Sequence, residues 1–209
     1  MLPSLAVAGL FVTFEGIDRS GKTTQARMLC DALGERALAV REPGGTPVGE
    51  QVRTLLKDPS VEIGPHAEAL LFAAARAELV ERVIRPALEA GRVVVSDRFL
   101  DSSLAYQGEA RGLGVDEVAR VNEWAVSGLK PDITFLLALP ATEAAARGAE
   151  DDRFEAEGAG LQIRVQDAYE RMAAAEPERW RRIAADRDPA EVHGEVLAEV
   201  ESALAGVAA

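Results

Sequence analysis

Gly16, Gly21, Lys22 and Thr23 fit the spacing Gly-x-x-x-x-Gly-Lys-(Ser/Thr), and they directly follow the apolar stretch at residues 10–14. Glycines let such a loop approach an anion closely, and the helix that follows directs amide N–H groups at phosphate oxygens. Lys22 adds a positive charge, and the Thr23 hydroxyl can reach Mg2+. The spacing therefore predicts a loop that binds the phosphates of a nucleotide, made of Gly16, Ile17, Asp18, Arg19, Ser20, Gly21, Lys22, Thr23 and Thr24.

A second pair of charged residues, Asp97 and Arg98, follows the apolar residues 93–95. A carboxylate at the end of a strand, beside a phosphate loop, is placed to hold Mg2+ or its waters. Arg98 can bind a second phosphate there. An Asp-Arg pair at a strand end is more often a local ion pair, but the neighbouring phosphate loop favours a site.

Phe72 and Arg76 stand four residues apart, which places them on one face of a helix. An aromatic ring beside a guanidinium can hold a flat base, although most such phenylalanines belong to the core, and both interpretations stay open. Ser103, Tyr106 and Gln107 supply the hydroxyl and amide groups that recognition of a base or sugar requires.

Continuous apolar runs at residues 10–14, 37–40, 92–96 and 133–139 alternate with helical patterns at residues 67–89, 115–127, 161–174 and 192–204. Such a pattern predicts an α/β fold in which a parallel sheet has helices on both faces. Ligands then bind at the carboxyl ends of the strands, where the charged motifs lie. We expect one domain over residues 1–209.

The net charge of −12 disfavours a general nucleic-acid-binding protein, which needs a broad basic surface. The single cysteine, Cys30, cannot form an internal disulfide, and a reducing compartment is expected. No segment has the length of a membrane span or the pattern of a signal peptide. These features predict a cytoplasmic protein without nucleic-acid or membrane partners.

Four segments together resemble one family: FEGIDRSGKTTQ at residues 14–25, REPGGT at 41–46, LFAAAR at 71–76 and DRFLDSSLAYQG at 97–108. In this order and spacing they resemble thymidylate kinase over residues 11–170. The resemblance implies transfer of the γ-phosphoryl group of ATP to dTMP, with Mg2+, to give dTDP and ADP. It also implies a P-loop three-layer sandwich of about five parallel strands, and a homodimer formed through residues 67–89 and 115–127.

The resemblance assigns roles to the residues that match the family motifs. Lys22 and the loop amides would hold ATP, while Thr23, Asp97 and Asp18 would surround Mg2+. Asp18 is alternatively placed near the sugar 3′-hydroxyl. The dTMP site would comprise Asp18, Glu42, Phe72, Arg76, Arg98, Ser103, Tyr106 and Gln107. In it Phe72 would stack on thymine, Arg76 would bind O4, and Arg98 would bind the phosphate.

The catalytic arginine is left open by the resemblance, because one class of the family carries it in the phosphate loop and another in a lid. Arg19 matches the first class, and Arg147 and Arg153 match the second. The charged residues 147–160 are either a solvated connection or part of a lid at about 145–160. With Asp18, Lys22 and Arg98, these arginines form the predicted catalytic set.

Two alternative functions can be compared with the sequence. A GTP-dependent switch usually carries Asn-Lys-x-Asp, which this chain lacks. A deoxynucleoside kinase is closer, because Glu42-Pro43 is also typical of enzymes that use the carboxylate as a base toward a sugar hydroxyl, and another nucleoside monophosphate kinase is a further alternative. The resemblance at residues 184–189, where the family binds adenine, is weak.

Overall fold

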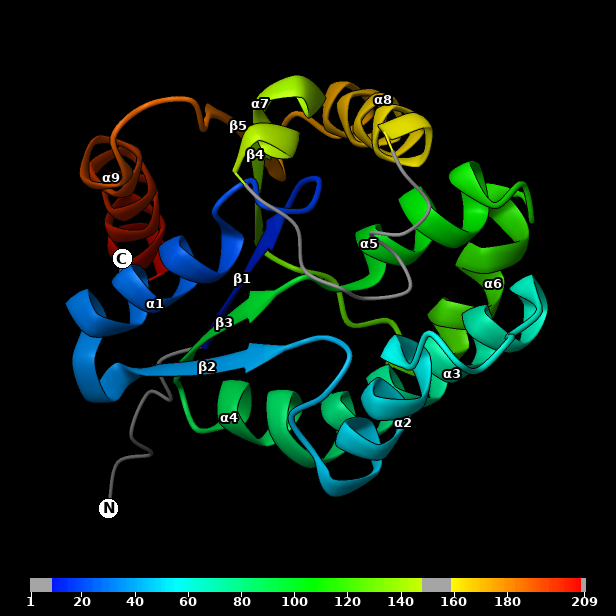
Figure 1. Ribbon diagram of the computed structural model, residues 1–209. Helices are drawn as coiled ribbons and strands as arrows, with labels where there is room; N and C mark the ends of the chain where they lie inside the picture. Colours follow the sequence, from blue (N-terminus) through cyan, green and yellow to red (C-terminus); the bar gives the residue numbers. More distant parts are fainter. Residues whose placement is uncertain (1–8, 148–158, 208–209) are drawn as a thin grey trace, which may run out of the picture.

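The computed structural model describes residues 9–147 and 159–207. Its centre is a parallel sheet of five strands in the order β2-β3-β1-β4-β5, shown in Figure 1. The strands are β1 (Leu10–Glu15), β2 (Ala37–Arg41), β3 (Val93–Asp97), β4 (Ile133–Ala138) and β5 (Trp180–Ala184). The predicted α/β fold with a parallel sheet of about five strands is confirmed.

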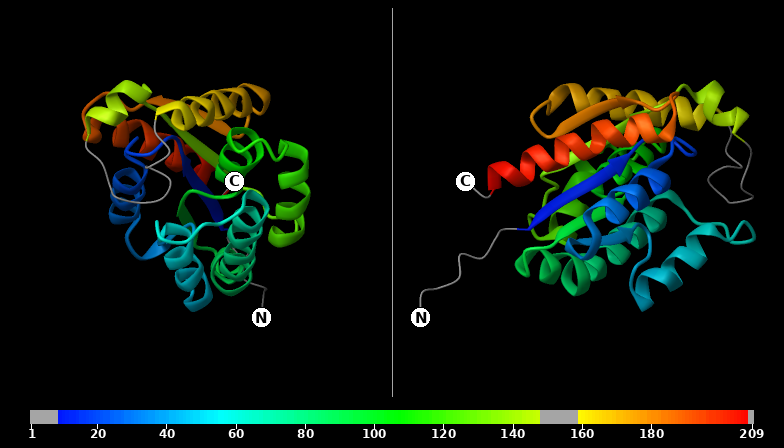
Figure 2. Two further views of the ribbon diagram at one scale, coloured as in Figure 1. Left: turned by 45° about the vertical axis from the view of Figure 1, so that its right-hand side comes forward. Right: turned by 90° about the vertical axis from the view of Figure 1, so that its left-hand side faces the viewer.

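The helices cover both faces of this sheet (Figure 2). On one face α1 contacts α9 and the strands β1, β2 and β3, while α4 and α8 pack on strands from the other face. The helical elements are α1 (Lys22–Leu33), α2 (Pro47–Lys57), α3 (Pro65–Leu79), α4 (Arg85–Glu89), α5 (Leu100–Ser103), α6 (Val115–Val126), α7 (Ala141–Ala146), α8 (Ala159–Ala175) and α9 (Pro189–Val207), with a 3-10 turn at Gly34–Arg36 and π-helical turns at Val80–Ile84 and Leu104–Ala110. The π-helical turns continue α3 into α4 and extend α5.

The central strands are buried because helices shield both of their faces. Every residue of β1 and β4 is buried, whereas the edge strand β2 alternates between buried and more exposed positions. The pairing register of the strands determines which of their carboxyl ends lie side by side. Phe14 pairs with Asp97 and Glu15 pairs with Leu136, so the loop after β1 begins beside the end of β3.

The strand β5 and the helix α2 are absent from the sequence prediction, as are the short helices α5 and α7. The strand β5 carries Arg181 and Arg182, which pair with Glu199 and Glu170 at the sheet edge, so it lacks a continuous apolar run. The helix α2 begins with a recognisable cap, since the Thr46 hydroxyl accepts a hydrogen bond from the Gly49 amide at 3.0 Å. Val48, Val52, Leu55 and Leu56 follow helical spacing, so the sequence carries a signal for this helix that the prediction did not use.

An ion pair shielded from solvent joins Arg179, which directly precedes β5, to Asp101 on α5. Arg179 contacts both carboxylate oxygens of Asp101, at 2.6 and 3.0 Å, and donates to the Thr134 hydroxyl at 2.8 Å. The two side chains are only 14% and 5% exposed. Removing one partner would leave the other charge uncompensated in the interior.

We predict that Arg179→Met lowers the free energy of unfolding by roughly 3 kcal/mol, because Asp101 stays buried without its cation. Arg182→Met is the matched control, since Arg182 pairs with Glu170 at 55% exposure and such pairs contribute about 0–1 kcal/mol. Urea unfolding at 25 °C measures both. Equal losses in the two variants would contradict the prediction.

Candidate active site

The phosphate loop lies between β1 and α1, and its backbone requires glycine at two positions. Gly16 has φ 141°, and a Cβ there would lie 2.8 Å from the Leu137 carbonyl oxygen. Gly21, with φ 99°, directly precedes the first residue of α1. This conformation turns the chain so that the amino end of α1 opens toward the cavity described below, as expected of an anion-binding loop.

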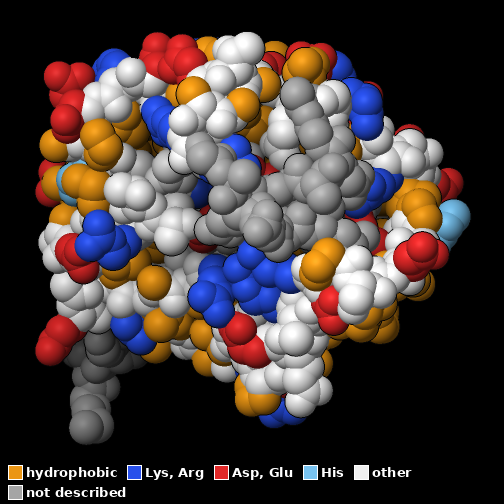
Figure 3. Space-filling view, in the orientation of Figure 1, with side chains coloured by type: hydrophobic (Ala, Val, Ile, Leu, Met, Phe, Trp, Pro, Cys, Tyr) orange, Lys and Arg blue, Asp and Glu red, His pale blue; other side chains and the backbone are white. Residues whose placement is uncertain are grey.

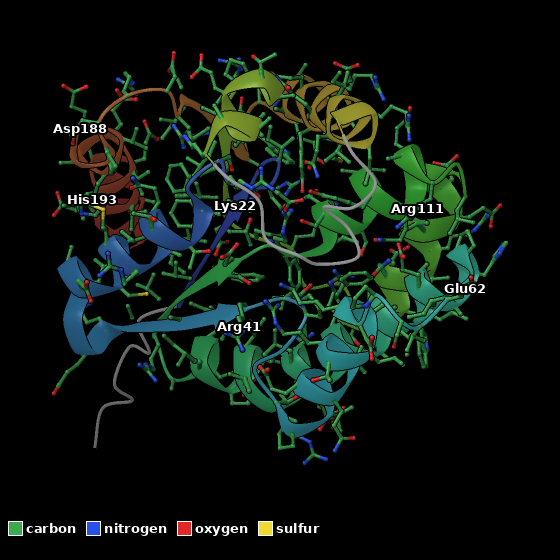
Figure 4. All side chains as sticks on the ribbon, in the orientation of Figure 1. Lys22, Arg41, Glu62, Arg111, Asp188 and His193 are labelled. Atoms are coloured by element: carbon green, nitrogen blue, oxygen red, sulfur yellow. The ribbon has the colours of Figure 1, made fainter. Side chains whose placement is uncertain are left out.

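Lys22 is buried at the start of α1, and Figure 4 labels it above the strand ends. Its ammonium group donates to the Ile17 carbonyl oxygen at 2.6 Å and to the Ser20 hydroxyl at 3.4 Å. Burial, followed by the positive charge of Arg98, lowers the pKa of Lys22 to about 8. A bound phosphate would oppose both effects, so this lysine favours an anion beside it.

Thr23 and Asp97 meet because β1 and β3 are neighbours. The Thr23 hydroxyl donates to an Asp97 carboxylate oxygen at 2.5 Å. A hydroxyl and a carboxylate are ligands that suit Mg2+, which usually keeps several waters and binds substrate phosphates as well. Among residues 9–147 and 159–207 no group of three or more acidic, His or Cys side chains could hold a metal ion alone. The donor set therefore fits a Mg2+ ion shared with a nucleotide.

Arg98 is the most connected cation of the site. Its guanidinium forms an ion pair with Asp18 at 2.5 Å and lies 5.1 Å from the centre of the Tyr106 ring. It also donates to the hydroxyls of Ser102 and Tyr169, at 3.1 and 3.2 Å. Arg98 itself adopts φ 72°, an uncommon backbone conformation outside glycine. These contacts fix its side chain in one position.

Asp18 joins the phosphate loop to Arg98. Burial alone would raise its pKa, but the positive charges of Arg98 and Lys22 outweigh burial and hold the pKa of Asp18 below its ordinary value. The second carboxylate oxygen accepts a hydrogen bond from Gln162 at 2.7 Å. The carboxylate thus stays charged between the two cations.

Glu15 was not predicted from the sequence as a site residue. It is fully buried at the end of β1 and accepts hydrogen bonds from the Phe99 amide, Ser102 and Tyr169 at 2.8, 2.6 and 2.8 Å. Ser102 and Tyr169 are also partners of Arg98, so Glu15 organises the groups that hold this arginine. The available signal was a glutamate at the end of an otherwise largely apolar strand.

Arg76 and Glu42 form a second buried ion pair, with 2.6 Å between guanidinium and carboxylate. Arg76 also contacts Asn122 and donates to the Phe99 carbonyl oxygen at 3.2 Å. Burial raises the pKa of Glu42, and Arg76 opposes this effect. One oxygen of Glu42 and the Ser103 hydroxyl are buried without a hydrogen-bond partner in the described part of the chain. Such polar atoms are satisfied when a ligand supplies the partner.

Most of the charged groups described above surround one cavity of about 640 Å3. Its lining residues are Asp18, Arg19, Gly21, Lys22, Thr23, Thr24, Arg41, Glu42, Pro43, Arg53, Lys57, Phe72, Arg76, Asp97, Arg98, Ser102, Ser103, Tyr106, Gln107 and Arg147. Figure 3 shows Lys and Arg side chains gathered near the centre of this face, where Figure 4 labels Arg41. The protein carries a net negative charge, so this local excess of cations indicates an anionic ligand.

The cavity brings together most of the predicted site residues. Gly16, Ile17 and Ser20 shape the loop but do not line the cavity, and Arg153 lies outside the described residues, as does most of the predicted lid. Several lining residues were not predicted from the sequence: Arg41 at the end of β2, and Pro43, Arg53 and Lys57 on the segment that follows. Arg53 and Lys57 stand on the unpredicted helix α2, four residues apart. Their shared helix face was the signal that could have found them.

Arg147 directly follows α7 and connects the phosphate loop to the segment that follows β5. It donates to the Arg19 carbonyl oxygen at 3.1 Å and to the Ala185 carbonyl oxygen at 2.9 Å. The Arg19 guanidinium in turn donates to the Ala144 carbonyl oxygen at 3.4 Å. Two of the three candidate catalytic arginines are therefore neighbours at the same end of the cavity.

We predict that Glu15 makes folding stability depend on pH. Burial, followed by the negative charge of Asp101, raises the pKa of Glu15 from 4.5 to about 7. Between these values the unfolded chain ionises first, so wild-type stability falls as pH rises. Glu15→Gln does not titrate, and its stability relative to wild type should rise by roughly 2 kcal/mol from pH 5 to pH 7.5. Urea unfolding measures the difference, and a difference that stays constant with pH would contradict the prediction.

None of the helices in the described ranges is both long and apolar enough to cross a membrane.

Known proteins resemble this chain over most of its length. The sequence profile of the thymidylate kinase family matches residues 14–196. A thymidylate kinase of Halothermothrix orenii is 45% identical over 205 residues, which cover 94% of this chain and 98% of that protein. One of Symbiobacterium thermophilum is 46% identical over 201 residues, with 93% and 94% covered. The crystal structure of thymidylate kinase from Ehrlichia chaffeensis matches with a TM-score of 0.77 and 33% identity, over 92% of this chain and 99% of that one. The chain belongs to the thymidylate kinase family.

Proposed function

We propose that this protein transfers the γ-phosphoryl group of ATP to dTMP, with Mg2+, and so produces dTDP and ADP. The observation that carries the proposal is that one cavity contains two separate cations, the buried Lys22 and the largely buried Arg98, with Asp18 between them. Each cation can hold the phosphate of one nucleotide. Such an arrangement suits a reaction that depends on positioning and charge compensation more than on covalent chemistry.

The phosphate loop would form the donor half of the cavity, the part that binds ATP. Lys22 and the amides of residues 16–24 would hold the ATP phosphates, as a helix amino end does with anions. Thr23 and Asp97 would hold the Mg2+ ion, which neutralises developing charge on the phosphates. Both oxygens of Asp18 already face cationic or amide groups, which supports a role near the acceptor for this residue.

The other side of the cavity would form its acceptor half, the part that binds dTMP. Arg98 would bind the dTMP phosphate, and the Tyr106 ring, on which its guanidinium lies, would pack against the deoxyribose. Phe72 would stack on thymine. Arg76 would donate to the base carbonyl oxygen, and the unpartnered hydroxyl of Ser103 would gain a hydrogen bond.

The transferring phosphoryl group needs a cation that stabilises its charge in the transition state. Arg19 and Arg147 line the cavity at one end, which supports either of them in this role. Single-turnover rates of Arg19→Ala, Arg147→Ala and Arg153→Ala would identify the arginine with the largest effect.

The alternative of a deoxynucleoside kinase would use Glu42 as a base toward a sugar hydroxyl. Glu42 is instead paired with Arg76 and its side chain is only 4% exposed. A carboxylate in this pair is a structural partner of the base-binding arginine, which favours the monophosphate as acceptor.

We also propose a homodimer formed through α3 and α6. These helices contact each other and expose large apolar side chains: Leu70 is 57% exposed and Trp124 is 84% exposed. Exposed aromatic residues of this kind are enriched at protein interfaces.

Sedimentation should therefore show a species of two chains for the wild-type protein. Trp124→Glu is expected to shift it toward the monomer, because a charge would be buried at the interface. Ile163→Glu is the matched control, since Ile163 is 50% exposed on α8, away from the proposed interface. A wild-type monomer, or equal effects of the two substitutions, would contradict the homodimer.

Lys22→Ala and Arg98→Ala should each lower kcat on the order of 10²–10³-fold, the effect of removing one preorganised charge from a transition state. The Arg98 change should raise KM for dTMP more than KM for ATP, and the Lys22 change should do the reverse. Steady-state kinetics with both substrates varied measures this, and circular dichroism verifies the fold. Equal changes in both KM values would contradict the assignment of the two halves.

ADP release measured with every nucleoside monophosphate, and with thymidine, tests the reaction itself. dTMP should be the best acceptor. Faster phosphorylation of thymidine than of dTMP would instead establish the alternative function.

A further inference from the structure

Gln107, which lines the cavity, is held in place by Glu68 on α3. Its amide nitrogen donates to a carboxylate oxygen of Glu68 at 2.9 Å. Glu68 lies on α3 and is 1% exposed. Gln107 lies on the π-helical turns that follow α5 and is 2% exposed. The contact is therefore a buried one between two helical segments.

The Glu68 carboxylate is fixed from its other side by Arg111. The Arg111 guanidinium contacts one oxygen through Nε and the other through Nη2, both at 3.1 Å. Planar two-point contacts of this kind restrict both distance and orientation. The carboxylate that receives the Gln107 amide is thus held in one position before any ligand binds.

This contact decides which end of the Gln107 amide is available to a ligand. A carboxylate paired with a guanidinium accepts hydrogen bonds and donates none, so the amide NH2 group must face Glu68. The amide oxygen then lies on the opposite side. Within the described part of the chain no group donates to that oxygen, whereas Gln107 forms part of the cavity wall. Gln107 therefore offers an acceptor to the ligand.

We propose that Glu68 is a positioning residue that keeps the Gln107 amide oxygen toward the base, so that the acceptor site selects a pyrimidine with an N–H group at ring position 3. This inference rests on the proposed function. Thymine and uracil carry that donor, whereas position 3 of cytosine is itself an acceptor. Two acceptors facing each other leave a buried polar group unpaired, which is how such sites reject a near-isostere.

Glu68→Gln tests the proposal, because a glutamine can donate as well as accept and no longer dictates the orientation of Gln107. We expect kcat/KM for dTMP to fall on the order of 10-fold, mainly through KM, and the ratio of kcat/KM for dTMP over dCMP to fall on the order of 10-fold. Glu78→Gln is the matched control on the same helix, since Glu78 pairs at the surface with Arg82. Its ratio should equal that of wild type.

The Gln107→Ala background separates positioning from a structural effect. If Glu68 acts through Gln107, Glu68→Gln should change the dTMP-to-dCMP ratio in wild type and leave it unchanged in Gln107→Ala. An unchanged ratio in the single variant, or equal changes in both backgrounds, would overturn the proposal.

Arg111→Met gives a second route, because it loosens the Glu68 carboxylate without altering either residue of the amide contact. It should lower the same ratio in the same direction, even if Glu68→Gln fails to fold, and a ratio equal to wild type would overturn the proposal. Wild-type protein that does not phosphorylate dTMP would refute the proposed function instead, so the two failures are distinguishable.

Discussion

The placement of two positive side chains, the buried Lys22 and the largely buried Arg98, in one cavity is the constraint on which the site depends. Lys22 and Arg98 are close enough for Arg98 to contribute to the lowered pKa of Lys22. Desolvated cations are costly without partners. Asp18 pairs directly with Arg98, and Asp97 and Glu15 favour the charged form of Lys22. These carboxylates compensate the cations in part, and phosphate groups of two nucleotides would complete the compensation.

The sheet makes this arrangement possible. Because β1 lies between β3 and β4, the phosphate loop begins beside Asp97, and Glu15 at the end of β1 reaches the residues that follow β3. Parallel strands place all of these groups at one edge, where ligands of α/β proteins bind. The ion pair of Arg179 and Asp101 connects the start of β5 to α5, the helix that follows Arg98. Thus contacts remote from the cavity hold the segment that carries Arg98.

Features that depend on a local sequence pattern could be predicted from the sequence. The phosphate loop is defined by spacing, and the central strands by continuous apolar runs, so both were predicted. Sequence prediction failed at β5, where arginines in surface ion pairs interrupt the apolar run, and at α2, whose helical apolar spacing was overlooked among turn residues. It also missed Glu15 and Glu68, since their roles depend on partners 87 and 39 residues away in the chain. Such roles follow from three-dimensional contacts, which one sequence does not reveal.

In the proposed function, ATP and dTMP bind side by side in one cavity of each chain. A compound that joins adenosine and thymidine through a polyphosphate tests it most directly, by calorimetry and by competition kinetics. We expect one compound bound per chain, competing with both ATP and dTMP, with weaker binding in Lys22→Ala and in Arg98→Ala. Two compounds bound per chain, or competition with only one of the substrates, would contradict it.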